Sequence, residues 1–155
     1  MSEPLRVRTL DARATVPRRH SADAAGVDLA ACLPADAPAI VIEPRAIVVV
    51  PTGLAVAIPR GCEGQVRPRS GLATTRGITL PNSPGTIDAD YRGELRVALI
   101  NLSERPQRIE HGDRIAQLVI APVVMCEVEE VDELEATARG EGGFGSTGVS
   151  AATTS

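Results

Sequence analysis

Aromatic residues are almost missing from this sequence of 155 residues, which has one Tyr, one Phe and no Trp. A hydrophobic core must therefore be built from Val, Ile, Leu and Ala, and only Tyr91 and Phe144 can stack on a planar ligand. Lysine is absent as well, because all 16 basic residues are Arg. This absence excludes Schiff-base chemistry and the lysine of a P-loop.

Cysteines are few and lie far apart in the chain. Cys32, Cys62 and Cys126 form neither an even disulfide framework nor a zinc-binding spacing. The first residues show no apolar targeting stretch, and no apolar run approaches the length of a membrane span. The net charge of −4 does not provide the basic surface that nucleic-acid binding requires. We therefore expect a cytoplasmic protein that binds neither nucleic acid nor a membrane.

Short β-branched runs separated by Pro and Gly make up most of the chain, whose length fits one domain. Several of the runs alternate, as Leu95, Val97 and Leu99 do, and this period of two is typical of strands. One short helix is expected from Ser70 to Arg76. The sequence predicts an all-β sandwich or jelly-roll, with strands near residues 40–42, 46–50, 54–58, 95–100, 115–120 and 123–128.

The composition changes toward the C-terminus, where a glycine-rich stretch begins at Arg139. Such a stretch cannot supply a core, so we expect a β domain over residues 1–135 and a flexible arm over residues 136–155. Glycines can form anion-binding backbone nests, and Phe144 can stack on a base for about 1–3 kcal/mol. Composition alone is equally compatible with a terminus that binds nothing.

Two segments in the first half of the chain combine charge with turn residues. Asp28 lies among small and apolar residues, where a carboxylate must be hydrogen-bonded or bind a cation. The local sequence favours a turn Asp that is satisfied by backbone amides. Arg69, Ser70 and Gly71 lie at a predicted strand-to-helix turn, which suits phosphate. An exposed turn with solvated arginines explains this second segment equally well.

Residues 82–94 are the richest segment, because turn residues flank a short extended piece. They predict a hairpin whose backbone groups can read the edge of a base. Asp88 is a candidate general base, and Tyr91 offers a flat face to a sugar. A solvated acidic loop is the alternative, and the rarity of aromatic residues here disfavours it.

Gln117 lies on an apolar strand and needs a partner, which is either a ligand phosphate or a neighbouring backbone group.

Taken in order, five segments closely resemble the five motifs of the trimeric dUTPases. The segments are residues 25–30 (AGVDLA), 68–73 (PRSGLA), 85–95 (GTIDADYRGEL), 112–118 (GDRIAQL) and 139–148 (RGEGGFGSTG). This resemblance implies a distorted jelly-roll, or β-clip, that assembles as a homotrimer. It also implies active sites between subunits and a C-terminal arm exchanged between them.

The same resemblance implies hydrolysis of dUTP at its α-phosphate to dUMP and pyrophosphate, with Mg²⁺ as cofactor. That reaction keeps uracil out of DNA and supplies dUMP for dTMP synthesis. Asp88 would activate the attacking water, and Asp28 would hold Mg²⁺ through water. The remaining substrate contacts would be phosphate ligands (Arg69, Ser70, Gly71, Gln117 and Arg139), the uracil and deoxyribose pocket (Asn82, Thr86, Ile87 and Tyr91), Arg96 facing the substrate, and Phe144 stacked on the base.

Two rival functions share this resemblance. A dCTP deaminase of the same fold would need a catalytic Glu in the pocket and would lack the glycine-rich arm, which this chain has. A non-catalytic trimer that binds a nucleotide would be expected to have lost Asp88 or Arg139, and the sequence retains both.

Overall fold

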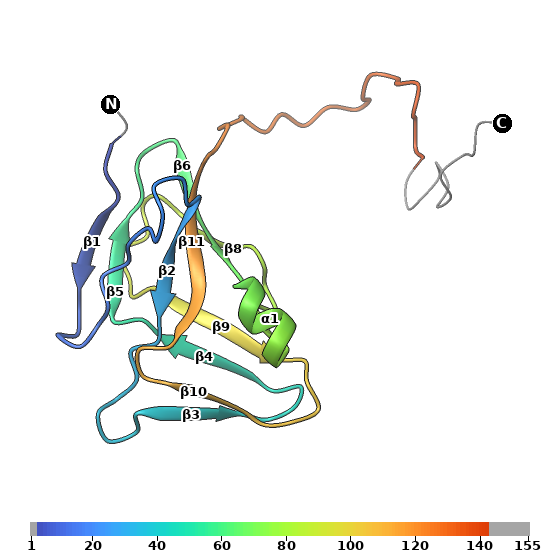
Figure 1. The fold of residues 1–155 in the computed structure, drawn as a ribbon. Coiled ribbons are helices and arrows are strands. Elements are labelled where there is room, and N and C mark those ends of the chain that lie inside the picture. Colours follow the sequence, from blue (N-terminus) through green and yellow to red (C-terminus); the bar gives the residue numbers. More distant parts are fainter. Residues whose placement is uncertain (1–2, 143–155) are drawn as a thin grey trace. The chain divides into compact units, whose positions relative to one another are not determined.

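The computed structural model describes residues 3–142, so Phe144 and the rest of 143–155 lie outside the described residues. The chain divides into two units, one ending at Met125 and the other beginning at Cys126. Figure 1 shows the strands and one short helix of the first unit. Its elements are β1 (Arg6–Thr9), β2 (Gly26–Ala30), β3 (Ala39–Ile42), β4 (Ile47–Pro51), β5 (Leu54–Ala57), β6 (Cys62–Arg67), α1 (Ser70–Arg76), β7 (Ile78–Thr79), β8 (Gly85–Ile87), β9 (Arg96–Asn101), β10 (Gln107–Glu110) and β11 (Arg114–Pro122).

The strands form four antiparallel sheets around one core. The largest sheet has the order β2-β11-β6-β8, a second has the order β4-β9-β7, and the pairs β1-β5 and β3-β10 complete the unit. All four sheets contribute aliphatic side chains to one buried cluster, which includes Leu29, Ile42, Val50, Val56, Val66, Leu99, Ile109 and Leu118. The predicted all-β, jelly-roll-like fold with an aliphatic core is confirmed.

Helix α1 spans the residues predicted for it, and local chemistry explains both its length and its end. Gly77 follows the last residue with a φ of 66°, and its backbone N–H donates to the carbonyl of Leu72. Glycine adopts this left-handed conformation without a steric penalty. A Cβ at position 77 would lie 2.9 Å from the backbone nitrogen of Ser103, so the close approach of that loop also requires glycine.

Five of the six predicted strand runs correspond to β3, β4, β5, β9 and β11. The sixth prediction, a strand over residues 123–128, is wrong. Among the described residues this run has no ladder partner, and Val124, Met125 and Val128 are 86%, 84% and 99% exposed. Strand propensity reflects packing on a pleated, half-buried surface, and this run has no such surface in the described structure.

The hairpin predicted within residues 82–94 is also wrong. β8 pairs with β6, with Thr86 opposite Gln65, whereas β9 pairs with β4 and β7. The segment between β8 and β9 therefore crosses from one sheet to another, and the N–H of Leu95 donates to the carbonyl of Leu54 at 2.7 Å. Among the described residues, no helix has the length and apolar character needed to cross a membrane.

Candidate active site

The outer face of the four-stranded sheet carries several of the predicted ligand residues. Gln117 on β11 lies opposite Asp28 on β2 and opposite Arg67 on β6. Residues directly opposite one another in an antiparallel sheet share a face, and their chain neighbours face the other way. The neighbours Leu118 and Val66 are buried in the core. The sheet therefore presents a polar row to the outside.

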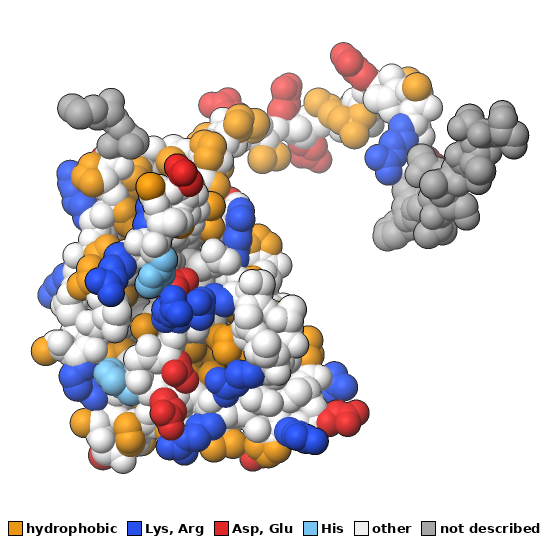
Figure 2. Space-filling model, in the orientation of Figure 1, with side chains coloured by type: hydrophobic (Ala, Val, Ile, Leu, Met, Phe, Trp, Pro, Cys, Tyr) orange, Lys and Arg blue, Asp and Glu red, His pale blue; other side chains and the backbone are white. Residues whose placement is uncertain are grey.

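Asp28 is surrounded by two arginines and a histidine. Its Oδ2 lies 2.9 Å from Nη1 of Arg114 and 3.2 Å from Nε2 of His20, and its Oδ1 lies 3.3 Å from Nε of Arg69. Two guanidinium groups, rather than backbone amides, satisfy the carboxylate in the part of the chain that the structure describes. Basic side chains gather with a histidine and a carboxylate over β2 and β11 in Figure 2.

Sequence reasoning missed Arg114 and His20 as members of this cluster. Arg114 lies in the GDRIAQL segment, and its place in a motif could have marked it as a candidate site residue. Its contact with Asp28 became evident only from the pairing of β11 with β2. His20 lies outside the five segments, and nothing in the sequence pattern points to it.

The turn before α1 is held against β11. Gln117 donates from Nε2 to the carbonyl oxygen of Pro68 at 3.0 Å, so a backbone group is its partner in this structure. Arg69 donates from Nη1 to the carbonyl oxygen of Arg114 at 3.1 Å. Ser70 and Gly71 are exposed, and a Cβ at Gly71 would meet no atom within 4 Å. The surface at this turn is therefore open to a ligand.

A second group of predicted residues lies around a small hollow on the crossover between β8 and β9. The hollow has a volume of about 200 Å³ and is lined by Thr86, Ile87, Asp88, Tyr91, Glu94 and Arg96. Tyr91 is 43% exposed, and its hydroxyl donates to the carbonyl oxygen of Glu94 at 3.0 Å. A Cβ at Gly93 would lie too close to that hydroxyl, so glycine at this position leaves the Tyr91 side chain in place. Glu94 is a lining residue that sequence reasoning missed.

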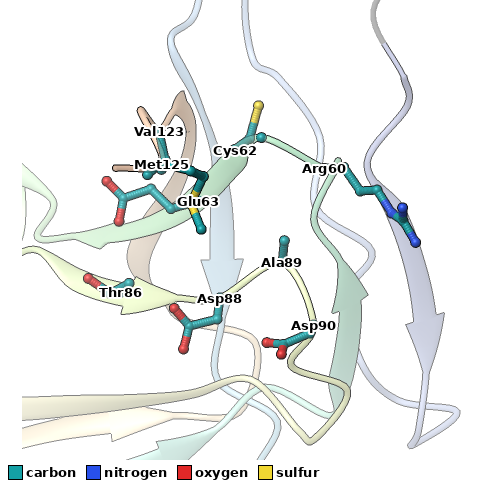
Figure 3. Close-up of a pocket in the computed structure, with 10 residues that line it drawn as sticks. Arg60, Cys62, Glu63, Thr86, Asp88, Ala89, Asp90, Val123 and Met125 are labelled. Carbon is teal, nitrogen blue, oxygen red and sulfur yellow. The ribbon is translucent and has the colours of Figure 1, made fainter. Parts of the chain in front are cut away.

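Asp88 is also accessible from a larger hollow of about 550 Å³. Figure 3 shows its carboxylate on the same side of the segment as that of Asp90, while Ala89 points the other way. Asn82 lies in the turn before β8, and a Cβ at Gly85 would be 3.1 Å from its Nδ2. It lines neither of these two hollows.

The residues around Asp28 and the residues around Asp88 lie at opposite edges of one sheet. Asp28 is on the edge strand β2, and Asp88 directly follows the other edge strand, β8. Three interstrand spacings of roughly 4.8 Å separate these strands by about 14 Å, before any offset along the strands is added. A single chain therefore does not bring Asp28 and Asp88 to the same phosphate group.

Arg139 belongs to the second unit and lies in a local turn. Its Nε donates to the carbonyl oxygen of Gly142 at 2.7 Å, and the N–H of Gly140 donates to the carbonyl oxygen of Thr137 at 3.1 Å. Gly140 has a φ of 51°. The predicted arm and its contacts with a ligand stay predictions, and Phe144 lies outside the described residues.

The residues around Asp28 fit a cation that arrives with a phosphate ligand. In the described part of the chain, no three His, Cys, Asp or Glu side chains are grouped to hold a metal ion. Mg²⁺ keeps several waters and is usually bound through one or two carboxylates together with substrate phosphates. One carboxylate beside two arginines, a residue type that suits phosphate, matches that donor set.

The fold, the basic cluster around Asp28 and the hollow at Asp88 together indicate an all-β protein that binds a phosphorylated ligand. The chain belongs to the dUTPase family, whose family model matches residues 12–148. A deoxyuridine 5'-triphosphate nucleotidohydrolase of Desulfotalea psychrophila is 60% identical over 135 residues, which are 87% of this chain and 88% of the relative. The protein of the same name from Syntrophotalea carbinolica is 54% identical over 144 residues, which are 93% and 96% of the two chains.

Solved structures show the same fold. A variant dUTPase of Staphylococcus bacteriophage 80alpha with dUpNHpp has a TM-score of 0.84 and 32% identity, covering 96% of this chain and all of that one (100%). A variant dUTPase of phage phi11 of S. aureus, described with a structural Mg(II) ion, has a TM-score of 0.75 and 29% identity. The alignment covers 86% of this chain and 100% of the phage chain.

Proposed function

We propose that this chain is a dUTP diphosphatase, which hydrolyses dUTP to dUMP and pyrophosphate. The observation that carries the proposal is the hollow in which Asp88, Tyr91 and Arg96 meet, on a chain of the dUTPase family. An exposed carboxylate, a sugar-sized aromatic face and a cation are the groups that water activation, nucleoside binding and phosphate binding need.

Asp88 is the proposed general base. Its exposed carboxylate accepts a proton from water, and the water oxygen forms a bond to the α-phosphorus. The bond from the α-phosphorus to the oxygen that bridges to the β-phosphate then breaks, and that oxygen leaves with pyrophosphate. General-base catalysis typically contributes about 10²–10⁴-fold. Positioning and electrostatic stabilisation of the triphosphate supply the rest.

The Asp28 group is the proposed phosphate-binding part of the site. Arg69, Ser70, Gly71 and Gln117 contact phosphate oxygens, and Asp28 holds Mg²⁺ through water. Charge on the triphosphate oxygens is neutralised by Mg²⁺ when it is bound. Because a guanidinium binds phosphate in a bidentate manner, Arg69 can exchange its contact with Asp28 for a contact with the nucleotide.

The complete site is proposed to form between copies of the chain in a homotrimer. The placement of Asp28 and Asp88 at opposite edges of one sheet supports this, because both are needed at one triphosphate. The arm over residues 136–155 would be exchanged between subunits, and would bring Arg139 to the phosphates and Phe144 to the base.

Uracil recognition is assigned to β8 and its flanks. Within residues 3–142, β8 is the last strand of its sheet and pairs with β6 on one side only, so its other side presents unpaired backbone groups. Such groups at Thr86 and Ile87, with Asn82, can pair with the edge of uracil. The amino group of cytosine would place a donor against a donor, and buried unpaired groups make that rejection strong. Tyr91 lies where the deoxyribose would pack.

The test is pyrophosphate release from dUTP, UTP, dCTP and dTTP with Mg²⁺. We expect release from dUTP alone, and a fall in kcat of about 10²–10⁴-fold in Asp88→Asn. Asp23→Asn is the matched control, because Asp23 is exposed and lines neither hollow. Ammonia from dCTP, or a folded wild type without turnover of any nucleotide, would contradict the proposal.

A cytoplasmic location is also proposed. All three cysteines are free, including the exposed Cys126, and free thiols persist in reducing compartments. Fractionation of cells that express the protein would test this location.

A further inference from the structure

The chain contains two Glu–Arg pairs with the same spacing and nearly the same geometry. Arg96 approaches Glu94 with its Nε at 2.8 Å, and Arg108 approaches Glu110 with its Nε at 2.9 Å. The arginines are equally exposed, at 62% and 60%, but the glutamates are not. Glu94 is 21% exposed and Glu110 is 61% exposed. The two pairs therefore differ in how firmly the carboxylate is held.

Glu94 is anchored by its second oxygen. Its Oε1 accepts a hydrogen bond from the backbone N–H of Gly53 at 3.0 Å. Gly53 is buried in the turn between β4 and β5 with a φ of 68°. A Cβ there would lie 2.9 Å from both Cys32 Sγ and Ala14 Cβ. Because that turn is packed on several sides, the donor to Glu94 occupies a fixed position.

The backbone around Glu94 is fixed as well. The hydroxyl of Tyr91 donates to the carbonyl oxygen of Glu94, and the N–H of Leu95 donates to the carbonyl oxygen of Leu54. The buried hydroxyl of Thr52 donates to the carbonyl oxygen of Leu95 at 2.5 Å. Glu94 thus joins the turn that carries Tyr91 to the turn between β4 and β5.

Arg96 has only one charged partner among the described residues, and that partner is Glu94. A long exposed arginine samples many rotamers unless a partner limits it. The bond from its Nε to a carboxylate that cannot swing away keeps the guanidinium at the rim of the hollow that contains Asp88 and Tyr91. Without the arginine, the same carboxylate would face an anionic substrate.

We propose that Glu94 is a positioning residue of the dUTP site, which acts through Arg96 and does not touch the substrate. This inference rests on the proposed function and adds a residue to it. The inference predicts the direction of each effect on activity. Removing the charge of Glu94 should lower activity while Arg96 is present. The same change should leave activity unchanged or raise it once Arg96 has been replaced by a neutral residue.

A double-mutant cycle of Glu94→Gln, Arg96→Gln and both together tests the proposal. The glutamine at position 94 keeps an oxygen that can accept from Gly53, so the fold is preserved, and the urea midpoint of each variant verifies this. We expect Glu94→Gln to lower kcat/KM for dUTP about 10-fold in the wild-type background, and not to lower it in the Arg96→Gln background. The matched control is the cycle of Glu110→Gln and Arg108→Gln, which should leave kcat/KM unchanged.

A second readout separates this inference from the proposed function. Tyr91 is the only tyrosine and the chain has no Trp, so its fluorescence reports binding of the non-hydrolysable analogue dUpNHpp at this hollow. We expect the same non-additive pattern in the Kd of the analogue. Equal losses from Glu94→Gln in both backgrounds would overturn the proposal in favour of a purely structural role, as would no loss in either. A wild type that binds the analogue but does not hydrolyse dUTP would overturn the proposed activity. The Kd values of the four variants would still test the role of Glu94.

Discussion

The guanidinium of Arg114 donates to Oδ2 of Asp28 at 2.9 Å, although 86 residues separate the two in the chain. Arg114 begins β11, and a register shift between Arg114 and Ala116 in its pairing with β2 accompanies this contact. Asp28 is therefore paired with cations before any ligand binds. Phosphate groups that attract Arg114 and Arg69 would leave the carboxylate available to a hydrated cation.

The first prediction concerns this carboxylate. We expect Asp28→Asn to raise the Mg²⁺ concentration for half-maximal dUTP hydrolysis about 10–100-fold, since loss of an outer-sphere metal partner typically has an effect of that size. Activity would be measured across a Mg²⁺ titration at saturating dUTP. Asp23→Asn is the control, because Asp23 is exposed and has no ion pair in the described structure. An unchanged Mg²⁺ dependence in Asp28→Asn would remove Asp28 from the metal site.

The second prediction concerns discrimination between deoxyribose and ribose. Tyr91 holds its ring at the hollow through its own hydroxyl, and Gly93 leaves the space that this requires. We expect Tyr91→Ala to lower the ratio of kcat/KM for dUTP to that for UTP by about 10-fold, a typical value for one steric contact.

Tyr91→Phe is the matched variant for that measurement. It keeps the ring and removes the hydrogen bond to Glu94, so it should retain most of the discrimination. Equal ratios in Tyr91→Ala and the wild type would show that another group excludes the 2′-hydroxyl.

Features that depend on adjacent residues could be predicted from the sequence. The helix from Ser70 to Arg76 is one such feature, because its end is set by Gly77 and by the hydrogen bond from Gly77 to Leu72, five residues earlier. The hairpin predicted within residues 82–94 was wrong for the opposite reason. Turn residues indicate that the chain reverses, but the choice of β6 as the partner of β8 is a long-range event.

The same distinction between local and long-range features explains which parts of the candidate site could be predicted. Thr86, Ile87, Asp88 and Tyr91 fall within six residues of sequence, so one segment was enough to group them. Glu94 lies close to them, but its anchoring partner Gly53 is 41 residues away. The separation of Asp28 from Asp88 depends on the order of strands in a sheet, which no local pattern encodes.

The third prediction is a pH dependence of stability near the N-terminus. Hydrogen bonds from the Arg13 guanidinium and then from its backbone N–H hold the pKa of Asp11 below its ordinary value of 3.8. A depressed carboxyl pKa stabilises the fold at pH values above the unfolded pKa, and this stabilisation is lost as the pH falls through 3.8 toward the folded pKa. Arg13 also donates to the carbonyl oxygen of Leu33 at 2.9 Å, so the contact ties the N-terminal segment to the core.

We therefore expect the urea midpoint of the wild type to fall more steeply between about pH 5 and pH 3 than that of Asp11→Asn, which cannot release this stabilisation by protonation. Asp23→Asn serves again as the control and should follow the wild type. The difference between Asp11→Asn and the wild type should be largest at pH 5 and should shrink toward pH 3. If the two curves stay parallel, Arg13 does not stabilise the ionised form of Asp11 in solution, and another contact must fix this segment against Leu33.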